Sequence, residues 1–267
     1  MKLHYLIVMA IFVLTSGCSV GIQSPTPQAF VEELSSTLTQ QASIETTIPA
    51  TFTPEALATI TPEGFQPIDR DVIFRDEFVG RLEDGWEWVN EDPLTWSLST
   101  LRGSLQIQSE FGYIQYGSAK NVLLRNVPQG DFMVETSINF SARDADQFAG
   151  IVLLESEKNF IQSGLSYCAE VVGCILDAFY IDTFENGRLI LPREFFSFED
   201  SIISVQMVIR DGNLQVFTSP NGLVWYRNTL QKPMPFKPLK VGLFTGQNTD
   251  PVLIPATFGY FEISIPK

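Results

Sequence analysis

The chain has 267 residues, 45% of them hydrophobic, and carries 31 acidic against 17 basic residues, for a formal net charge of −14. A chain this acidic is repelled by phosphate backbones and by anionic lipid surfaces, which argues against nucleic acid as a partner. The only histidine, His4, lies in the apolar N-terminal region. The rest of the chain therefore lacks the residue that the usual serine or cysteine nucleophiles and histidine-containing zinc sites require.

The first 18 residues have the order of a bacterial lipoprotein signal. Lys2 is followed by an apolar run from Tyr5 to Leu14 and then by small residues before Cys18. This run is shorter than the ~20 apolar residues of a membrane-spanning helix, and small residues before a cysteine suit the peptidase that leaves a lipidated cysteine. We predict a leader over residues 1–18, a lipid on Cys18, and export to the cell envelope, where the protein is anchored to the membrane and faces the exterior or the periplasm. Cleavage as an ordinary secretory signal is the alternative.

Residues 19–70 are predicted to form a disordered stalk. They are rich in Thr, Ser and Pro and contain no Lys, Trp, Tyr or Cys. Such a composition cannot bury enough apolar surface to offset the entropy lost on ordering. A short helix over residues 28–41 is the alternative for part of this segment. The composition changes at Asp71, so a globular domain is expected over residues 71–267.

The globular part reads as a series of short strands. Between Phe132 and Phe140 apolar residues mostly alternate with more polar ones, the period of a half-buried antiparallel strand. The run from Ile203 to Ile209 alternates in the same way and leads into the turn signal Asp211-Gly212. No convincing helix is present, so an all-β sandwich or barrel is predicted. Further strands are expected over residues 72–78, 105–108, 122–125, 148–154, 159–164, 178–183, 214–218, 240–245 and 258–265.

Several short sequence marks follow one another in a set order. The first are Asp76-Glu77-Phe78, Trp86, Trp88, Pro93, Trp96-Ser97-Leu98 and Gly103-Ser104-Leu105, and the later ones are Asp131-Phe132 and residues 147–153, 219–225 and 258–261. This order resembles the concanavalin A-like C-terminal domain of β-xylosidases across the whole globular part. The resemblance implies a jelly-roll β-sandwich of two curved antiparallel sheets.

The resemblance also bears on function. In that family the domain usually follows a five-bladed catalytic propeller and lends an aromatic side chain to its active site, and these residues contain no propeller. In the wider superfamily the concave sheet often binds glycans. The resemblance therefore favours a surface-anchored, non-catalytic module whose partner is a polysaccharide or an oligosaccharide. The alternatives are a structural or protein-binding envelope domain and a glycoside hydrolase with an unrecognised carboxylate pair.

Aromatic side chains stack on the apolar faces of sugar rings and are the natural ligand candidates. Trp96 and Trp225 are assigned to the core because of their strand and turn context. Phe195 and Phe196 are neighbours in a chain that alternates sides, so they cannot both face one core. The candidate glycan-binding residues are Trp86, Trp88, Tyr113, Tyr116, Tyr180, Phe195 and Phe196.

Carboxylate pairs for glycoside cleavage are weakly indicated. Asp144 and Asp146, like Glu155 and Glu157, have the two-residue spacing that a strand could use. Both pairs fall in turn-like segments, where solvated loop charges are the simpler interpretation. No catalytic residue is therefore predicted.

Metal and cysteine chemistry are also weakly indicated. No cofactor is expected. The carboxylates of Asp76, Glu77, Asp92 and Asp250 could bind a structural calcium ion. The sequence contains no calcium-loop motif. In an exported protein, Cys168 and Cys174 are expected to form a disulfide that staples a short loop. Two buried reduced cysteines are the alternative.

Overall fold

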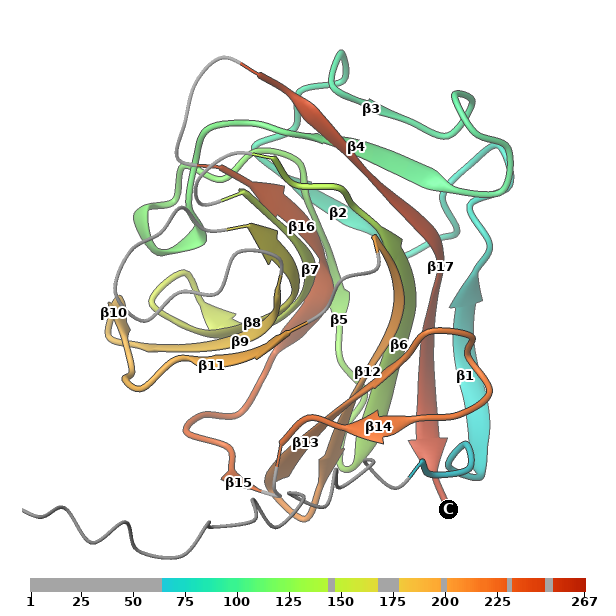
Figure 1. Ribbon diagram of the computed structural model, residues 1–267, viewed down its shortest axis with the longest axis vertical. Coiled ribbons are helices and arrows are strands. Elements are labelled where there is room, and N and C mark those ends of the chain that lie inside the picture. The colour runs from blue at the N-terminus through green and yellow to red at the C-terminus, as the bar shows by residue number, and fades with distance from the viewer. Residues whose placement is uncertain (1–63, 144–146, 168–177, 198–200, 230–231, 248–251) are drawn as a thin grey trace, which may run out of the picture. The chain divides into compact units, whose positions relative to one another are not determined.

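The computed structural model describes residues 64–267 apart from 144–146, 168–177, 198–200, 230–231 and 248–251, and the side chains of residues 195 and 197 are also not described. The described residues form the predicted all-β sandwich of two antiparallel sheets (Figure 1). No α-helix occurs among them, and the 3-10 turn η1 spans Ile114–Tyr116. Within the described ranges, no helix has the length and apolar character needed to cross a bilayer.

The first sheet has nine strands. Its hydrogen-bonded order is β14-β13-β12-β6-β17-β4-β3, while β1 pairs with β17 and β15 pairs with β13. The strands are β1 (Arg70–Asp76), β3 (Trp96–Ser97), β4 (Leu105–Ser109), β6 (Phe132–Asn139), β12 (Ile202–Arg210), β13 (Asn213–Ser219), β14 (Tyr226–Arg227), β15 (Lys232–Pro233) and β17 (Ile254–Pro266).

The second sheet has eight strands. Its order is β10-β9-β8-β7-β16-β5-β2, and β11 pairs with β9. The strands are β2 (Glu87–Val89), β5 (Val122–Asn126), β7 (Gln147–Ser156), β8 (Asn159–Tyr167), β9 (Ala178–Glu185), β10 (Arg188–Leu189), β11 (Glu194–Ser197) and β16 (Lys240–Gly246).

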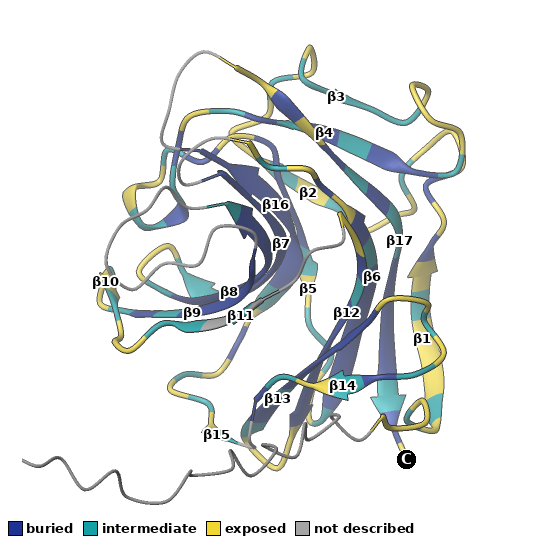
Figure 2. Cartoon of the chain, viewed as in Figure 1, coloured by how far each residue is buried: buried dark blue, intermediate teal, exposed yellow. Residues whose placement is uncertain are grey.

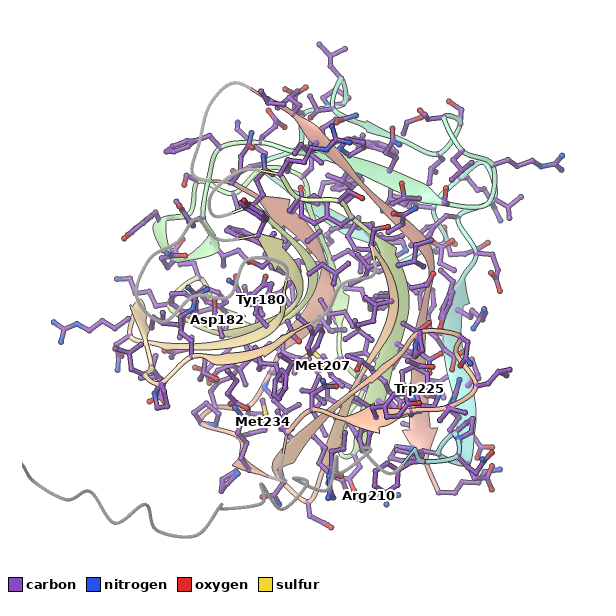
Figure 3. The ribbon with its side chains drawn as sticks, in the orientation of Figure 1. Tyr180, Asp182, Met207, Arg210, Trp225 and Met234 are labelled. Carbon is purple, nitrogen blue, oxygen red and sulfur yellow. The ribbon has the colours of Figure 1, made fainter. Side chains whose placement is uncertain are left out.

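The main core lies between the two sheets. Because side chains alternate along a strand, every second residue of the central strands points into this layer. Ile151 and Leu153 enter it from the eight-stranded sheet, and Val134, Val205 and Met207 enter it from the nine-stranded sheet. Figure 3 shows Met207 between the sheets. The central strands of both sheets are accordingly the most deeply buried parts of the molecule (Figure 2).

Strand β6 is buried on both faces, whereas its alternation predicted a half-buried strand. Its outward-facing Met133 and Glu135 are also inaccessible. Met133 packs with Trp225 in a small apolar cluster on the outer face of the nine-stranded sheet, and Glu135 is paired with Arg70 of β1. The prediction failed because a strand's own alternation does not reveal what other segments cover its polar face. The assignment of Trp225 to the protein interior is confirmed.

Residues 64–70 belong structurally with the sandwich, although the composition placed them in the stalk. Phe65 exchanges two backbone hydrogen bonds with Trp225, of 2.7 and 3.0 Å. Ile68 packs against the apolar cluster of the outer face, and β1 begins at Arg70. The described structure therefore starts several residues before Asp71.

Candidate functional site

The eight-stranded sheet curls strongly through β7, β8 and β9, and the inner side of the curl faces away from the nine-stranded sheet (Figure 1). Three large rings, Phe148, Tyr180 and Phe244, lie buried on this inner face. The Phe148 ring centroid is 6.4 Å from that of Tyr180 and 5.8 Å from that of Phe244. Phe179 and Ile181, the neighbours of Tyr180 on β9, point the other way, into the core between the sheets. The inner face thus has an aromatic floor of its own.

Paired glycines let neighbouring strands of this sheet approach closely. Gly150 on β7 lies directly opposite Gly164 on β8. A Cβ atom on Gly150 would overlap the carbonyl oxygen of Ser163, and one on Gly164 would overlap that of Ala149. Only a residue without a side chain tolerates such backbone proximity. These glycines therefore shape the part of the sheet that carries the aromatic floor.

An aromatic loop, residues 111–116, stands at the rim of this floor. The side chains of Tyr116 and Phe111 are 74% and 55% exposed, and Tyr113 between them is half-buried. The Tyr113 ring centroid lies 6.4 Å from Phe111, 5.9 Å from Tyr116 and 5.9 Å from Phe148. A continuous row of ring contacts therefore runs from the exposed rim to the buried floor.

Backbone hydrogen bonds hold the aromatic loop in one conformation. The amide of Gly117 donates to the Ile114 carbonyl at 2.9 Å, and that of Ser118 donates to the Tyr113 carbonyl at 3.1 Å. From outside the loop, the side-chain amide of Asn90 donates to the Gly117 carbonyl at 2.9 Å. A loop that is already ordered loses little conformational entropy when a ligand binds. The exposed rings are therefore preorganised.

A polar group lies on the inner face beside the aromatic floor. Asp182 accepts hydrogen bonds from Arg193 Nε at 2.8 Å and Nη2 at 2.7 Å, and from Gln162 Nε2 at 3.2 Å. Tyr180, two residues before Asp182 on β9, shares its face (Figure 3). Burial, and then the charge of Asp182, raise the pKa of the Tyr180 hydroxyl. That hydroxyl therefore stays protonated, and no described residue is its hydrogen-bond partner.

The predicted ligand residues fall into separate places. Tyr113, Tyr116 and Tyr180 are brought together, with Phe148 as the link between them. Phe196 instead packs on the core side of the sheet, with its ring centroid 6.2 Å from that of Phe179. The side chain of Phe195 lies outside the described part of the chain.

The two predicted tryptophans lie away from the aromatic loop, against the core between the sheets. Trp86 donates from Nε1 to Asp76 at 2.8 Å, and its ring centroid is 4.8 Å from that of Phe261. The ring of Trp88 contacts that of Trp96, with centroids 4.8 Å apart. All three tryptophans are half-buried and pack against the main core. Their density in the sequence therefore reflects packing at this end of the sandwich.

Asp76 organises the turn that precedes Trp86. Its buried carboxylate also accepts from the backbone amides of Phe78 at 2.8 Å and Glu83 at 2.9 Å. Among the described residues there is no group of three or more side chains able to hold a metal ion. Asp92 is hydrogen-bonded to the Leu94 amide. Asp250 lies outside the described residues, as do Cys18, Cys168 and Cys174.

Sequence reasoning missed five residues of this region. Phe111 lies two positions before Tyr113, and Asp182 lies two positions after Tyr180, so the two-residue period of a strand could have pointed to Asp182. Phe148 and Gln162 approach only through the pairing of β7, β8 and β9. Arg193 comes from the segment between β10 and β11, and no local pattern predicts its contact with Asp182.

Comparisons with known proteins agree with this architecture. The sequence matches the family model for the β-xylosidase C-terminal concanavalin A-like domain over residues 75–264. No curated protein sequence matches the chain. The structure is similar to the GH43 protein BlXynB of Bacillus licheniformis, with 19% identity and a TM-score of 0.64 over 72% of this chain and 39% of that one.

Two further solved structures share the fold. A xylan β-1,4-xylosidase of Bacillus halodurans has 15% identity and a TM-score of 0.61, over 71% of this chain and 38% of that one. The CBM2 module of the evolved Dit of Lactobacillus casei phage J-1 has 9% identity and a TM-score of 0.54, over 75% of this chain and 97% of that one. This chain thus spans less than half the length of the two Bacillus proteins. The sequence match and the two-sheet architecture together show that the chain belongs to the family of β-xylosidase C-terminal concanavalin A-like domains.

Proposed function

We propose that this protein is a non-catalytic carbohydrate-binding module whose ligand stacks on the exposed rings of the aromatic loop. The observation that carries the proposal is the exposure of Tyr116 and Phe111 on a loop fixed by hydrogen bonds and supported from beneath by Phe148. Contiguous exposed apolar patches mark binding sites, and the rings of Phe111, Tyr113 and Tyr116 form one such group. An aromatic face suits the apolar face of a sugar. The similar phage protein is itself described as a CBM2 module.

Three carboxylates are buried and paired with arginines, which supports glycan binding in preference to glycoside cleavage. Asp182 on the inner face is held by Arg193. Glu135 and Glu262, a cross-strand pair on the outer face of the other sheet, are held by Arg70 and Arg75. A general acid or a nucleophile must reach the glycosidic bond, whereas these three carboxylates are inaccessible and already paired.

Binding of the full chain to soluble polysaccharides such as arabinoxylan, xyloglucan and mixed-linkage β-glucan tests this proposal. We expect Tyr116→Ala to weaken the affinity for the preferred polymer about tenfold, because it removes a central stacking ring. Tyr116→Phe keeps the ring and should bind nearly as well. Leu94→Ala, which truncates another highly exposed apolar side chain, is the matched control for loss of surface area. Isothermal titration calorimetry gives the affinities, and an unchanged value for Tyr116→Ala would contradict the proposed site.

We also propose that the protein is exported and held at the cell envelope by a lipid on Cys18. The apolar run and the small residues before this cysteine support the proposal. Replacement of Cys18 by Ala should move the protein from the membrane fraction to the soluble fraction and abolish incorporation of labelled palmitate. Unchanged fractionation and labelling would contradict a lipid at this position.

A further inference from the structure

A pocket of about 490 Å³ opens where β6 ends and β17 begins. One side is polar and carries Asn139, Ser141, Arg143 and Gln147, and the other is the largely apolar run of residues 252–255. The volume lies within the range of small-ligand sites, which combine apolar walls with a few polar groups. The pocket is therefore large enough for a single sugar unit or a comparable group.

Arg143 gives the pocket a positive charge. Among the residues that the structure describes, its guanidinium has no ion-pair or hydrogen-bond partner. Its backbone is held in place, because its amide donates to Gln147 Oε1 at 2.8 Å. Gln147 is itself fully buried and donates from Nε2 to Gln247 Oε1 at 3.0 Å. In a chain with 31 acidic and 17 basic residues, an arginine that lines a pocket and has no partner among the described residues favours a ligand that brings its own carboxylate.

The pocket is structurally continuous with the aromatic loop. Gln247, the hydrogen-bond partner of Gln147, donates from its backbone amide to the Glu110 carbonyl at 3.1 Å and accepts from the Gly112 amide at 3.3 Å. Phe148 follows Gln147 directly on β7, and its ring supports that of Tyr113. The wall of the pocket and the base of the aromatic loop are therefore joined through a few buried residues.

We propose that the pocket binds a carboxylate-bearing substituent, a uronic acid unit, of a polysaccharide whose main chain stacks on the aromatic loop; this rests on the proposed function. The planar guanidinium of Arg143 matches a carboxylate with two parallel hydrogen bonds. The side-chain amide of Asn139 and the hydroxyl of Ser141 suit the sugar hydroxyls. Val252 and Leu253, both exposed on the facing wall, suit the apolar face of the sugar ring. The two sites together select an acidic branched chain over a neutral one.

The test compares a xylan that bears glucuronate substituents with the same polymer after chemical reduction of its carboxyl groups. The full chain should bind the acidic polymer about tenfold more tightly, a difference of about 1.4 kcal/mol. Arg143→Gln should remove this difference and leave the affinity for the reduced polymer unchanged. Tyr116→Ala should weaken binding of both polymers. Added salt should weaken binding of the acidic polymer more than that of the reduced one.

The possible failures are distinguishable. If the unaltered protein binds both polymers equally, or if Arg143→Gln affects both to the same extent, the uronate site is wrong and the carbohydrate-binding proposal stands. If the unaltered protein binds neither polymer nor any other soluble polysaccharide, the proposed function fails and the uronate site fails with it. Arg143→Lys keeps the positive charge but lacks the planar guanidinium, so it should retain only part of the preference for the acidic polymer over the reduced one.

Discussion

Removal of both guanidinium groups of β1, in the variant Arg70→Met/Arg75→Met, is expected to lower the free energy of unfolding by about 3–5 kcal/mol. The cause lies in two carboxylates that β1 covers. Glu135 on β6 and Glu262 on β17 are directly opposite each other, and like charges in that relation repel. Arg70 and Arg75 therefore neutralise a pair that the sheet itself places together.

Both arginines contact the glutamate pair directly. Arg70 Nη2 lies 3.2 Å from Glu135 Oε2, and Arg70 Nε lies 2.8 Å from Glu262 Oε1. Arg75 Nη1 lies 2.6 Å from Glu262 Oε2. The glutamate side chains are only 6% and 3% exposed. Without the arginines, two adjacent negative charges would remain buried with no positive charge beside them. Removing one side of a buried ion-pair network in this way strongly destabilises the folded state.

Urea unfolding followed by tryptophan fluorescence measures this effect. Adding Glu135→Gln and Glu262→Gln to the double variant removes the repulsion and should restore most of the lost stability. A double variant as stable as the unaltered protein, or one that the glutamine substitutions do not rescue, would contradict this account.

Most of the longer strands were predictable from the sequence because each contains an alternating or continuous apolar run bounded by turn residues. The predicted runs 105–108, 122–125 and 240–245 lie within β4, β5 and β16. Strands of two or three residues, such as β2, β14 and β15, were not predicted. A strand this short has no period to detect, and it forms only because a longer neighbour offers it hydrogen-bonding groups.

The candidate site was predictable only where it is local in the sequence. Tyr113 and Tyr116 stand close together, and both are among the predicted ligand residues. The support of Tyr113 by Phe148 and the contact of Arg193 with Asp182 depend on strand pairing and on a loop return, which no local pattern encodes. The cross-strand pair Glu135 and Glu262 was missed for the same reason. A search for carboxylates two residues apart finds pairs on one strand, not pairs across two strands.

Gly242→Ala is expected to lower the free energy of unfolding by on the order of 4 kcal/mol, or to prevent the full chain from accumulating in folded form. Gly242 lies on β16 between β5 and β7, opposite Leu124 and Val152. A Cβ atom there would lie 1.8 Å from the carbonyl oxygen of Leu123, far inside the van der Waals contact distance. Both adjoining strands are pinned by their own ladders, so the overlap can be relieved only by parting β16 from β5.

Gly130→Ala is the matched control for this substitution. Gly130 has a φ of +82° and nothing within 4 Å of an added Cβ, so alanine there meets only backbone strain of about 1 kcal/mol. Equilibrium unfolding of the two variants therefore separates overlap between strands from strain within one residue. Equal losses would show that the sheet relaxes around an added methyl group. A larger loss for Gly242→Ala would show that close approach of β5 and β16 is a fixed requirement of the fold, set by a glycine that strand propensity alone would count as unfavourable.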